Sequence, residues 1–97
     1  MLFTVIRYDK ADSVWLRQSE RPKHLVYLER VMHQIKSGGA LLNDEGQQIG
    51  SILIIDVANR REAEAFAYDD PYVEAALFES TYISPFRSVF EEGKRVG

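Results

Sequence analysis

The sequence predicts an α+β fold of the ferredoxin-like type, a four-stranded antiparallel sheet with helices on one face. Two observations favour this class. Candidate strands and helices follow one another in the order β-α-β-β-α-β, and right-handed crossovers then place the helices on the same side of the sheet. The chain has 97 residues, which provide one hydrophobic core, so we expect a single domain over residues 1–97.

The first predicted strand covers residues 2–8, a run rich in Phe, Thr, Val, Ile and Tyr. Alternation places Phe3 and Val5 on one face and Leu2 and Ile6 on the other, so both faces are apolar. A short helix should follow over residues 13–18, because Asp12 is a suitable N-cap.

The longest helical run extends from residue 20 to residue 37, with Pro22 in its first turn, where the missing N–H is not needed. Gly38 and Gly39 should end this helix, because glycine accepts the left-handed conformation of a C-terminal cap. Its apolar stripe faces the interior and includes one histidine. The stripe consists of His24, Leu28, Val31 and Ile35. The second histidine, His33, points to the opposite side, into water.

The middle of the chain predicts two strands joined by a turn. Residues 40–43 are a short strand candidate, and the Asp-Glu-Gly step at 44–46 is typical of a turn. Residues 48–57 form the strongest strand pattern in the sequence. Apolar residues again occupy both of its faces.

The last third of the chain predicts a helix, a single helical turn and a final strand. Asn59 is the expected N-cap of a helix over residues 61–69. Asp70 stands before a proline, so it should end that helix and cap a one-turn helix over residues 71–75. The final strand covers residues 76–86, and the charged tail after it is expected to be loose.

The predicted sheet has one face covered by helices and one face bare. Because the strands are apolar on both sides, the bare face needs a cover. We therefore expect a homodimer in which two copies pack back to back through the open faces of their sheets.

Charge and composition limit the partners and the environment. The formal net charge is −3, and Lys and Arg are scattered along the chain, which argues against nucleic acid or an anionic membrane as a partner. No apolar run suits a signal peptide or a membrane span, so we expect a cytoplasmic protein. There is no cysteine, and the two histidines lie on opposite sides of one helix, so neither a metal nor a cofactor is expected.

His24 and Asp70 are the candidate residues for chemistry. Asp70 continues the inward stripe of its helix, and a histidine bonded to a carboxylate has a fixed tautomer and a more basic free nitrogen. The alternative for His24 is a core histidine bonded to a backbone carbonyl, and the alternative for Asp70 is a helix cap. Both roles of Asp70 are compatible, because a carboxylate has two oxygens.

Four further residues are candidates for substrate binding. Arg17 and Arg21 lie four residues apart and share a face if one helix runs through both; a guanidinium binds carboxylates in bidentate fashion. Their alternative is to be solvated or paired with Asp or Glu. Tyr8, at the end of the first strand, and Tyr72 either donate a hydroxyl to a pocket or only pack.

The chain resembles the YCII-related proteins over nearly its whole length. The segments that carry the resemblance are RPKHL at 21–25, GSILI at 50–54, DDPYV at 69–73 and SPF at 84–86. The resemblance implies a small dimeric protein of the dimeric α/β-barrel type. It also implies that His24 and Asp70 form a catalytic pair and that Arg17, Arg21 and Tyr72 line or brace the pocket.

The resemblance and the His–Asp pair favour a cofactor-independent enzyme. Such an enzyme would move a proton on a small anionic or cyclic organic molecule, as a lyase, an isomerase or a dehalogenase does. Two alternatives stay open, namely a small-molecule-binding module without catalysis and a structural dimer accessory to another enzyme. Residues 40–49 lack the Gly-Pro step that many family members have there, which implies a different substrate preference if this hairpin borders the pocket.

Overall fold

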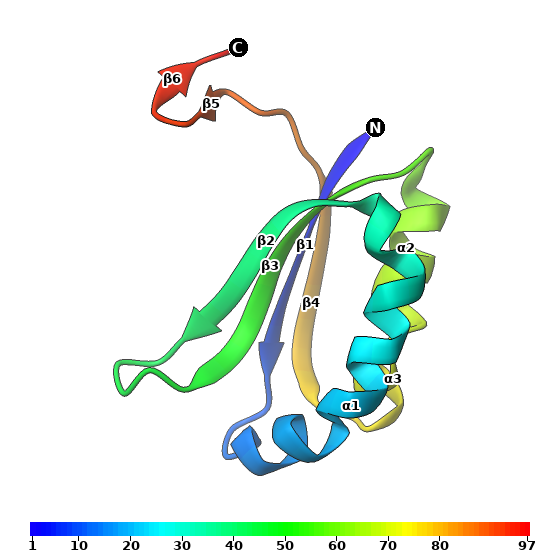
Figure 1. The fold of residues 1–97 in the computed structure, drawn as a ribbon, viewed down its shortest axis with the longest axis vertical. Helices are drawn as coiled ribbons and strands as arrows, with labels where there is room; N and C mark the ends of the chain where they lie inside the picture. The colour runs from blue at the N-terminus through cyan, green and yellow to red at the C-terminus, as the bar shows by residue number, and fades with distance from the viewer.

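Four antiparallel strands form one sheet, and the helices cover one of its faces (Figure 1). The computed structural model describes residues 1–97. The predicted α+β, ferredoxin-like fold is confirmed, because the spatial order is β2-β3-β1-β4 with all neighbours antiparallel. The strands are β1 (Leu2–Asp9), β2 (Ile35–Leu42), β3 (Gln48–Asp56) and β4 (Phe78–Pro85).

The helical layer differs from the prediction at its beginning. Its elements are α1 (Val14–Val31), the 3₁₀ turn η1 (Met32–Gln34), α2 (Arg60–Tyr68) and α3 (Pro71–Glu74). The prediction of a separate helix over residues 13–18 was wrong, because α1 includes most of these residues and continues past Pro22. A proline inside a helix removes one backbone hydrogen bond, and the ribbon of α1 changes direction between its blue and cyan parts (Figure 1). Asp12 is not the cap, because it has a φ of 57° and Ser13 stands at the N-cap position.

Gly38 and Gly39 were expected to end a helix, and this prediction was wrong, because both lie inside β2. The helical run ends at Gln34, and Ile35 packs against the core as a strand residue. A Cβ at Gly38 would lie 2.7 Å from the carbonyl oxygen of Ile52 on β3. The glycine therefore allows two strands to approach closely, which is a common role of glycine in sheets.

The second half of the chain follows the prediction closely. Asn59 accepts a hydrogen bond from the amide of Glu62 at 3.0 Å, so it caps α2 as predicted. The tail is not loose, because it forms a small hairpin of β5 (Phe90–Glu91) and β6 (Lys94–Arg95). None of the helices is both long enough and apolar enough to span a membrane.

The hydrophobic core lies between the sheet and the helices. It consists of Phe3, Val5, Ile55, Val57, Ala63, Phe66 and Ala67. Strand alternation puts Arg7 in the same row as Phe3 and Val5, and Arg7 is only 2% exposed. A buried charge needs a partner, and the partner of Arg7 is part of the candidate active site.

Candidate active site

His24 and Asp70 meet on the helix-covered side of the sheet, 46 residues apart in sequence. His24 Nδ1 lies 2.9 Å from Asp70 Oδ1. The Asp70 side chain is fully buried, whereas the His24 side chain is 13% exposed. Because an ionised carboxylate only accepts hydrogen bonds, the proton of the neutral imidazole is on Nδ1, and Nε2 keeps a free lone pair.

Besides His24, two groups from different elements hold Asp70, namely the Tyr72 amide and Arg7. Asp70 caps α3, as predicted, because its Oδ1 accepts a hydrogen bond from the Tyr72 amide at 2.9 Å. Arg7 Nη1 lies 3.2 Å from its Oδ2 and also donates to the carbonyl of Ala67. The Arg7 guanidinium in turn lies over the ring of Phe78, 4.5 Å from the centroid. The carboxylate therefore has one fixed orientation toward His24.

Opposing effects act on the pKa of Asp70. Burial by itself raises this pKa, but the hydrogen bonds from His24 and the Tyr72 amide and the charge of Arg7 outweigh the burial. The net result is a pKa below the ordinary value of an aspartate. Burial lowers the pKa of Arg7 although Asp70 opposes it. Arg7 nevertheless stays charged at neutral pH, as arginine does in proteins.

We expect the lowered pKa of Asp70 to make the protein sensitive to acid. The unfolded chain has the higher pKa, about 3.9 for an ordinary aspartate, so it takes up the proton first as the pH falls. The stabilisation is therefore complete above that value and is lost as the pH falls through the folded-state pKa. Denaturant titrations at a series of pH values measure it. Asp70→Asn should remove part of the acid dependence, and Asp69→Asn, at the exposed neighbour, should not; equal curves for wild type and Asp70→Asn would contradict this expectation.

Tyr72 fixes the plane of the imidazole. Its ring stacks on the His24 ring, with centroids 4.1 Å apart and planes at 19°. Its hydroxyl donates to the carbonyl of Arg17 at 3.2 Å. Burial raises the pKa of Tyr72 against the opposing charge of Arg17, so the hydroxyl keeps its proton at neutral pH.

Arg17 is buried and paired. Its Nε and Nη2 donate to the two carboxylate oxygens of Asp9 at 2.7 and 2.9 Å, a bidentate contact. Its guanidinium also lies 4.9 Å from the centroid of the Tyr72 ring. The structure thus shows Arg17 paired with an acid, one of the alternatives for this residue, while it still lines the cavity beside His24.

The other two candidates, Arg21 and Tyr8, do not line the cavity beside His24. Arg21 shares α1 with Arg17, as a continuous helix requires, and its exposed side chain lines a neighbouring hollow of about 380 Å³. Tyr8 lies on the open face of the sheet and is 42% exposed. Tyr8 is not among the residues of the His24 cavity. The structure therefore brings together His24, Asp70, Arg17 and Tyr72 but not Tyr8.

A cavity of about 250 Å³ opens beside His24, between α1 and the strands β2 and β3. Drug-sized ligands occupy pockets of about 300–1,000 Å³, so this cavity suits a smaller molecule. The lining combines polar and apolar groups. It consists of Arg7, Arg17, His24, Leu28, Gly38, Gly39, Gln48, Ser51, Leu53 and Tyr72.

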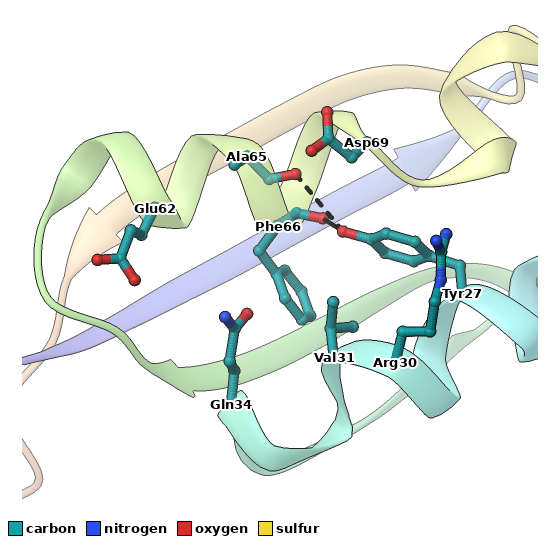
Figure 2. Close-up of a pocket in the computed structure, with 8 residues that line it drawn as sticks. All are labelled: Tyr27, Arg30, Val31, Gln34, Glu62, Ala65, Phe66 and Asp69. Atoms are coloured by element: carbon teal, nitrogen blue, oxygen red, sulfur yellow. Dashed lines mark hydrogen bonds between the residues drawn. The ribbon is translucent and has the colours of Figure 1, made fainter.

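Figure 2 shows a second cavity, of about 330 Å³, between α1 and α2. The Tyr27 hydroxyl points at α2 and donates to the carbonyl of Phe66 at 2.8 Å. Burial and the charges of Asp69 and Asp70 raise the pKa of Tyr27 to about 12, so this hydroxyl is no base at neutral pH. This second cavity is larger, but His24 lines only the first one.

Sequence reasoning missed three residues of the site, namely Arg7, Asp9 and Ser51. Alternation along β1 puts Arg7 and Asp9 in line with Phe3 and Val5, and a charge in such a row indicates a buried ion pair. Alternation along β3 likewise puts Ser51 on the same face as Ile55 and Leu53. The two-residue alternation of the strands could therefore have identified these three residues from the sequence.

Comparison with known proteins agrees with the fold. A family model described as YCII-related domain matches residues 1–87. Protein YciI of Escherichia coli O6:H1 is 35% identical over 99 residues, which cover 93% of this chain and 100% of that protein. A protein of Haemophilus influenzae is 26% identical with the same coverage. Among solved structures, 5-chloro-2-hydroxyhydroquinone dehydrochlorinase (TftG) of Burkholderia phenoliruptrix AC1100, in complex with 2,5-dihydroxybenzoquinone, matches with a TM-score of 0.82 and 32% identity over 90% of this chain and 94% of that one.

Proposed function

We propose that this chain, which belongs to the YCII-related family, is a small enzyme in which His24 transfers a proton on a small organic molecule. The observation that carries the proposal is the 2.9 Å contact between His24 Nδ1 and the buried carboxylate of Asp70 beside a cavity. This contact leaves Nε2 as the nitrogen that accepts the proton. Asp70 orients the ring and stabilises the imidazolium that forms.

The arrangement suits chemistry that begins with loss of a proton. A positioned histidine withdraws a proton from a carbon or a hydroxyl, and the bonding electrons move toward an electron-withdrawing group or expel a leaving group. Elimination of HCl is one such reaction: the base takes the proton, chloride leaves with the electrons of the C–Cl bond, and no electrons are gained or lost overall. Lyase, isomerase and dehalogenase chemistry all fall within this description.

The similarity to TftG supports this reaction class. TftG is a dehydrochlorinase of a chlorinated hydroxyhydroquinone and binds a dihydroxybenzoquinone. Because a shared fold alone does not fix function, the support comes from the likeness in sequence together with the His24–Asp70 geometry in this chain. We extend the proposal to cyclic molecules that carry oxygen substituents.

The surrounding residues receive supporting roles. Tyr72 keeps the imidazole in its plane by stacking and is a positioning residue. Arg17 borders the cavity with its charge balanced by Asp9. Arg21, one helical turn farther along α1, is exposed and lines the adjoining hollow, where it can attract an anionic substrate.

Two assays test the proposal. Purified protein is incubated with 5-chloro-2-hydroxyhydroquinone, and release of chloride is followed. In parallel, 2,5-dihydroxybenzoquinone is dissolved in D₂O, and exchange of its ring hydrogens is followed by NMR, which reports proton transfer without a leaving group. We expect the protein to accelerate at least the exchange. Binding of the quinone with no acceleration of either reaction would support a binding module instead.

We also propose that the protein is a homodimer. The open face of the sheet carries Ile6, Ile52 and Tyr82 in one row across three strands, and Ile52 and Tyr82 are 38% and 58% exposed. Burying these apolar side chains against another surface would stabilise the protein. The open face of a second copy of the same chain provides such a surface, because two identical faces can pack against each other.

Ile52→Lys is expected to convert the dimer into a monomer, because it places a charge in the centre of the apolar row. Sedimentation equilibrium measures the mass of both proteins. Val26→Lys is the matched control, since Val26 is an exposed apolar residue on α1, in the helical layer. A wild-type protein that sediments as a monomer at every concentration would contradict the dimer.

A further inference from the structure

Two buried hydrogen-bond donors beside His24 have no partner in the chain. They are Nε of Arg7 and Oγ of Ser51. Arg7 and Ser51 are direct neighbours across β1 and β3, and both point to the helix-covered face. Both also line the cavity that His24 lines. The two unused donors and the proposed base thus belong to one cavity.

An unpartnered buried donor is costly and calls for an explanation. Arg7 is 2% exposed, and its Nη1 contacts Ala67 and Asp70, whereas its buried Nε has no partner although the side chain lines the cavity. The ring of Phe78 lies against the guanidinium and holds it in place. Ser51 has no such second contact, and its hydroxyl is free to turn toward a ligand. The two residues face each other across β1 and β3 and line the same cavity, which favours one acceptor shared by both donors.

We propose that Arg7 Nε and Ser51 Oγ form a subsite for a ligand oxygen that becomes negative when His24 removes the proton. The inference rests on the proposed function and specifies its substrate class. The substrate is an enol, a phenol or a hydroxyquinone, in which the carbon or hydroxyl that loses the proton is conjugated to a ring or carbonyl oxygen. Donors aimed at a developing oxyanion stabilise the transition state more than the ground state.

The charges of the site favour an oxygen that gains its charge during the reaction. Asp70 balances Arg7, and Asp9 balances Arg17, so the cavity has no uncompensated fixed charge from these four residues. When His24 takes the proton, the imidazolium and the new oxyanion balance each other. The electron pair of the broken bond moves to the oxygen, and the proton stays on Nε2 until it is returned or lost to solvent.

The test uses 2,5-dihydroxybenzoquinone as the probe, because its ionised form carries negative charge on ring oxygens and so resembles the state that the subsite would stabilise after the proton transfer. Its affinity is measured by calorimetric titration, and the exchange of its ring hydrogens in D₂O is measured by NMR. Ser51→Ala should weaken binding about tenfold, the effect of one hydrogen bond to a charged group, and Ser51→Thr, which keeps the hydroxyl, should restore most of it. Thr81→Val is the matched control. Thr81 is the neighbour of Arg7 on β4 and does not line the cavity.

The outcomes separate this inference from the proposed function. Equal affinity of Ser51→Ala and wild type, or failure of the wild type to bind the probe, overturns the subsite. Where the wild type binds the probe and Ser51→Ala binds it equally well, loss of exchange in His24→Gln still supports the proposed base. Conversely, weaker binding by Ser51→Ala together with undiminished exchange by His24→Gln supports the subsite and contradicts the proposed base. A complex structure with a probe oxygen within hydrogen-bond distance of both donors supports the subsite directly.

Discussion

Replacing His24 with glutamine is expected to lower the rate of proton transfer by about 10²–10⁴-fold, the usual contribution of a general base. Glutamine keeps an N–H that can donate to Asp70, but its amide does not accept a proton at neutral pH. The stack on Tyr72 is partly lost, at a cost of about 1 kcal/mol. Deuterium exchange into 2,5-dihydroxybenzoquinone and denaturant titration measure the two effects separately.

The other histidine provides the control for this experiment. His33 lies in η1 and is exposed, away from the cavity. His33→Gln should therefore leave both the exchange rate and the affinity for the probe at wild-type values. If His24→Gln and His33→Gln have the same rate, the histidine in α1 is not the base.

Replacing Arg7 with methionine is expected to destabilise the fold by about 3–5 kcal/mol, because it leaves the buried carboxylate of Asp70 without its cation. Methionine fills much of the same volume, so loss of packing contributes little. The effect is a large share of the total stability of a small domain, about 5–15 kcal/mol. Denaturant titration at neutral pH measures the change in the free energy of unfolding.

Two further variants show whether the missing charge is the cause. In Arg7→Met combined with Asp70→Asn, the buried charge is gone, so the double variant should be more stable than the sum of the two single changes predicts. Arg60→Met removes an exposed arginine whose Nη1 lies 3.8 Å from Glu64, and it should cost less than about 1 kcal/mol. A cost for Arg7→Met as small as that for Arg60→Met would contradict the structural role of the pair.

The approach of His24 to Asp70 was predictable because each residue sits on a regular pattern. His24 replaces an apolar residue in the stripe of α1, and Asp70 is fixed by the proline that follows it. Local rules of this kind need no knowledge of distant contacts. The contact between the two elements then follows from the order of helices in a ferredoxin-like fold.

The errors arose where one residue type serves two structures. Gly38 and Gly39 suit a helix cap but also fit a strand, in which Gly38 approaches β3 closely, and only the pairing of β2 with β3 selects the strand. A proline is common in the first turn of a helix, yet Pro22 lies inside α1, which continues through it. Tyr8 was placed near the pocket by its position at a strand end, although the alternation of β1 assigns it to the open face.

The protonation state of the two ring nitrogens of His24 is the most direct test of this account. Long-range ¹⁵N–¹H NMR at a pH where the ring is neutral reports which nitrogen carries the proton. We predict the proton on Nδ1, donated to Asp70, and a lone pair on Nε2. A proton on Nε2 would mean that the nitrogen assigned as the base is blocked, and the proposed proton transfer would be contradicted.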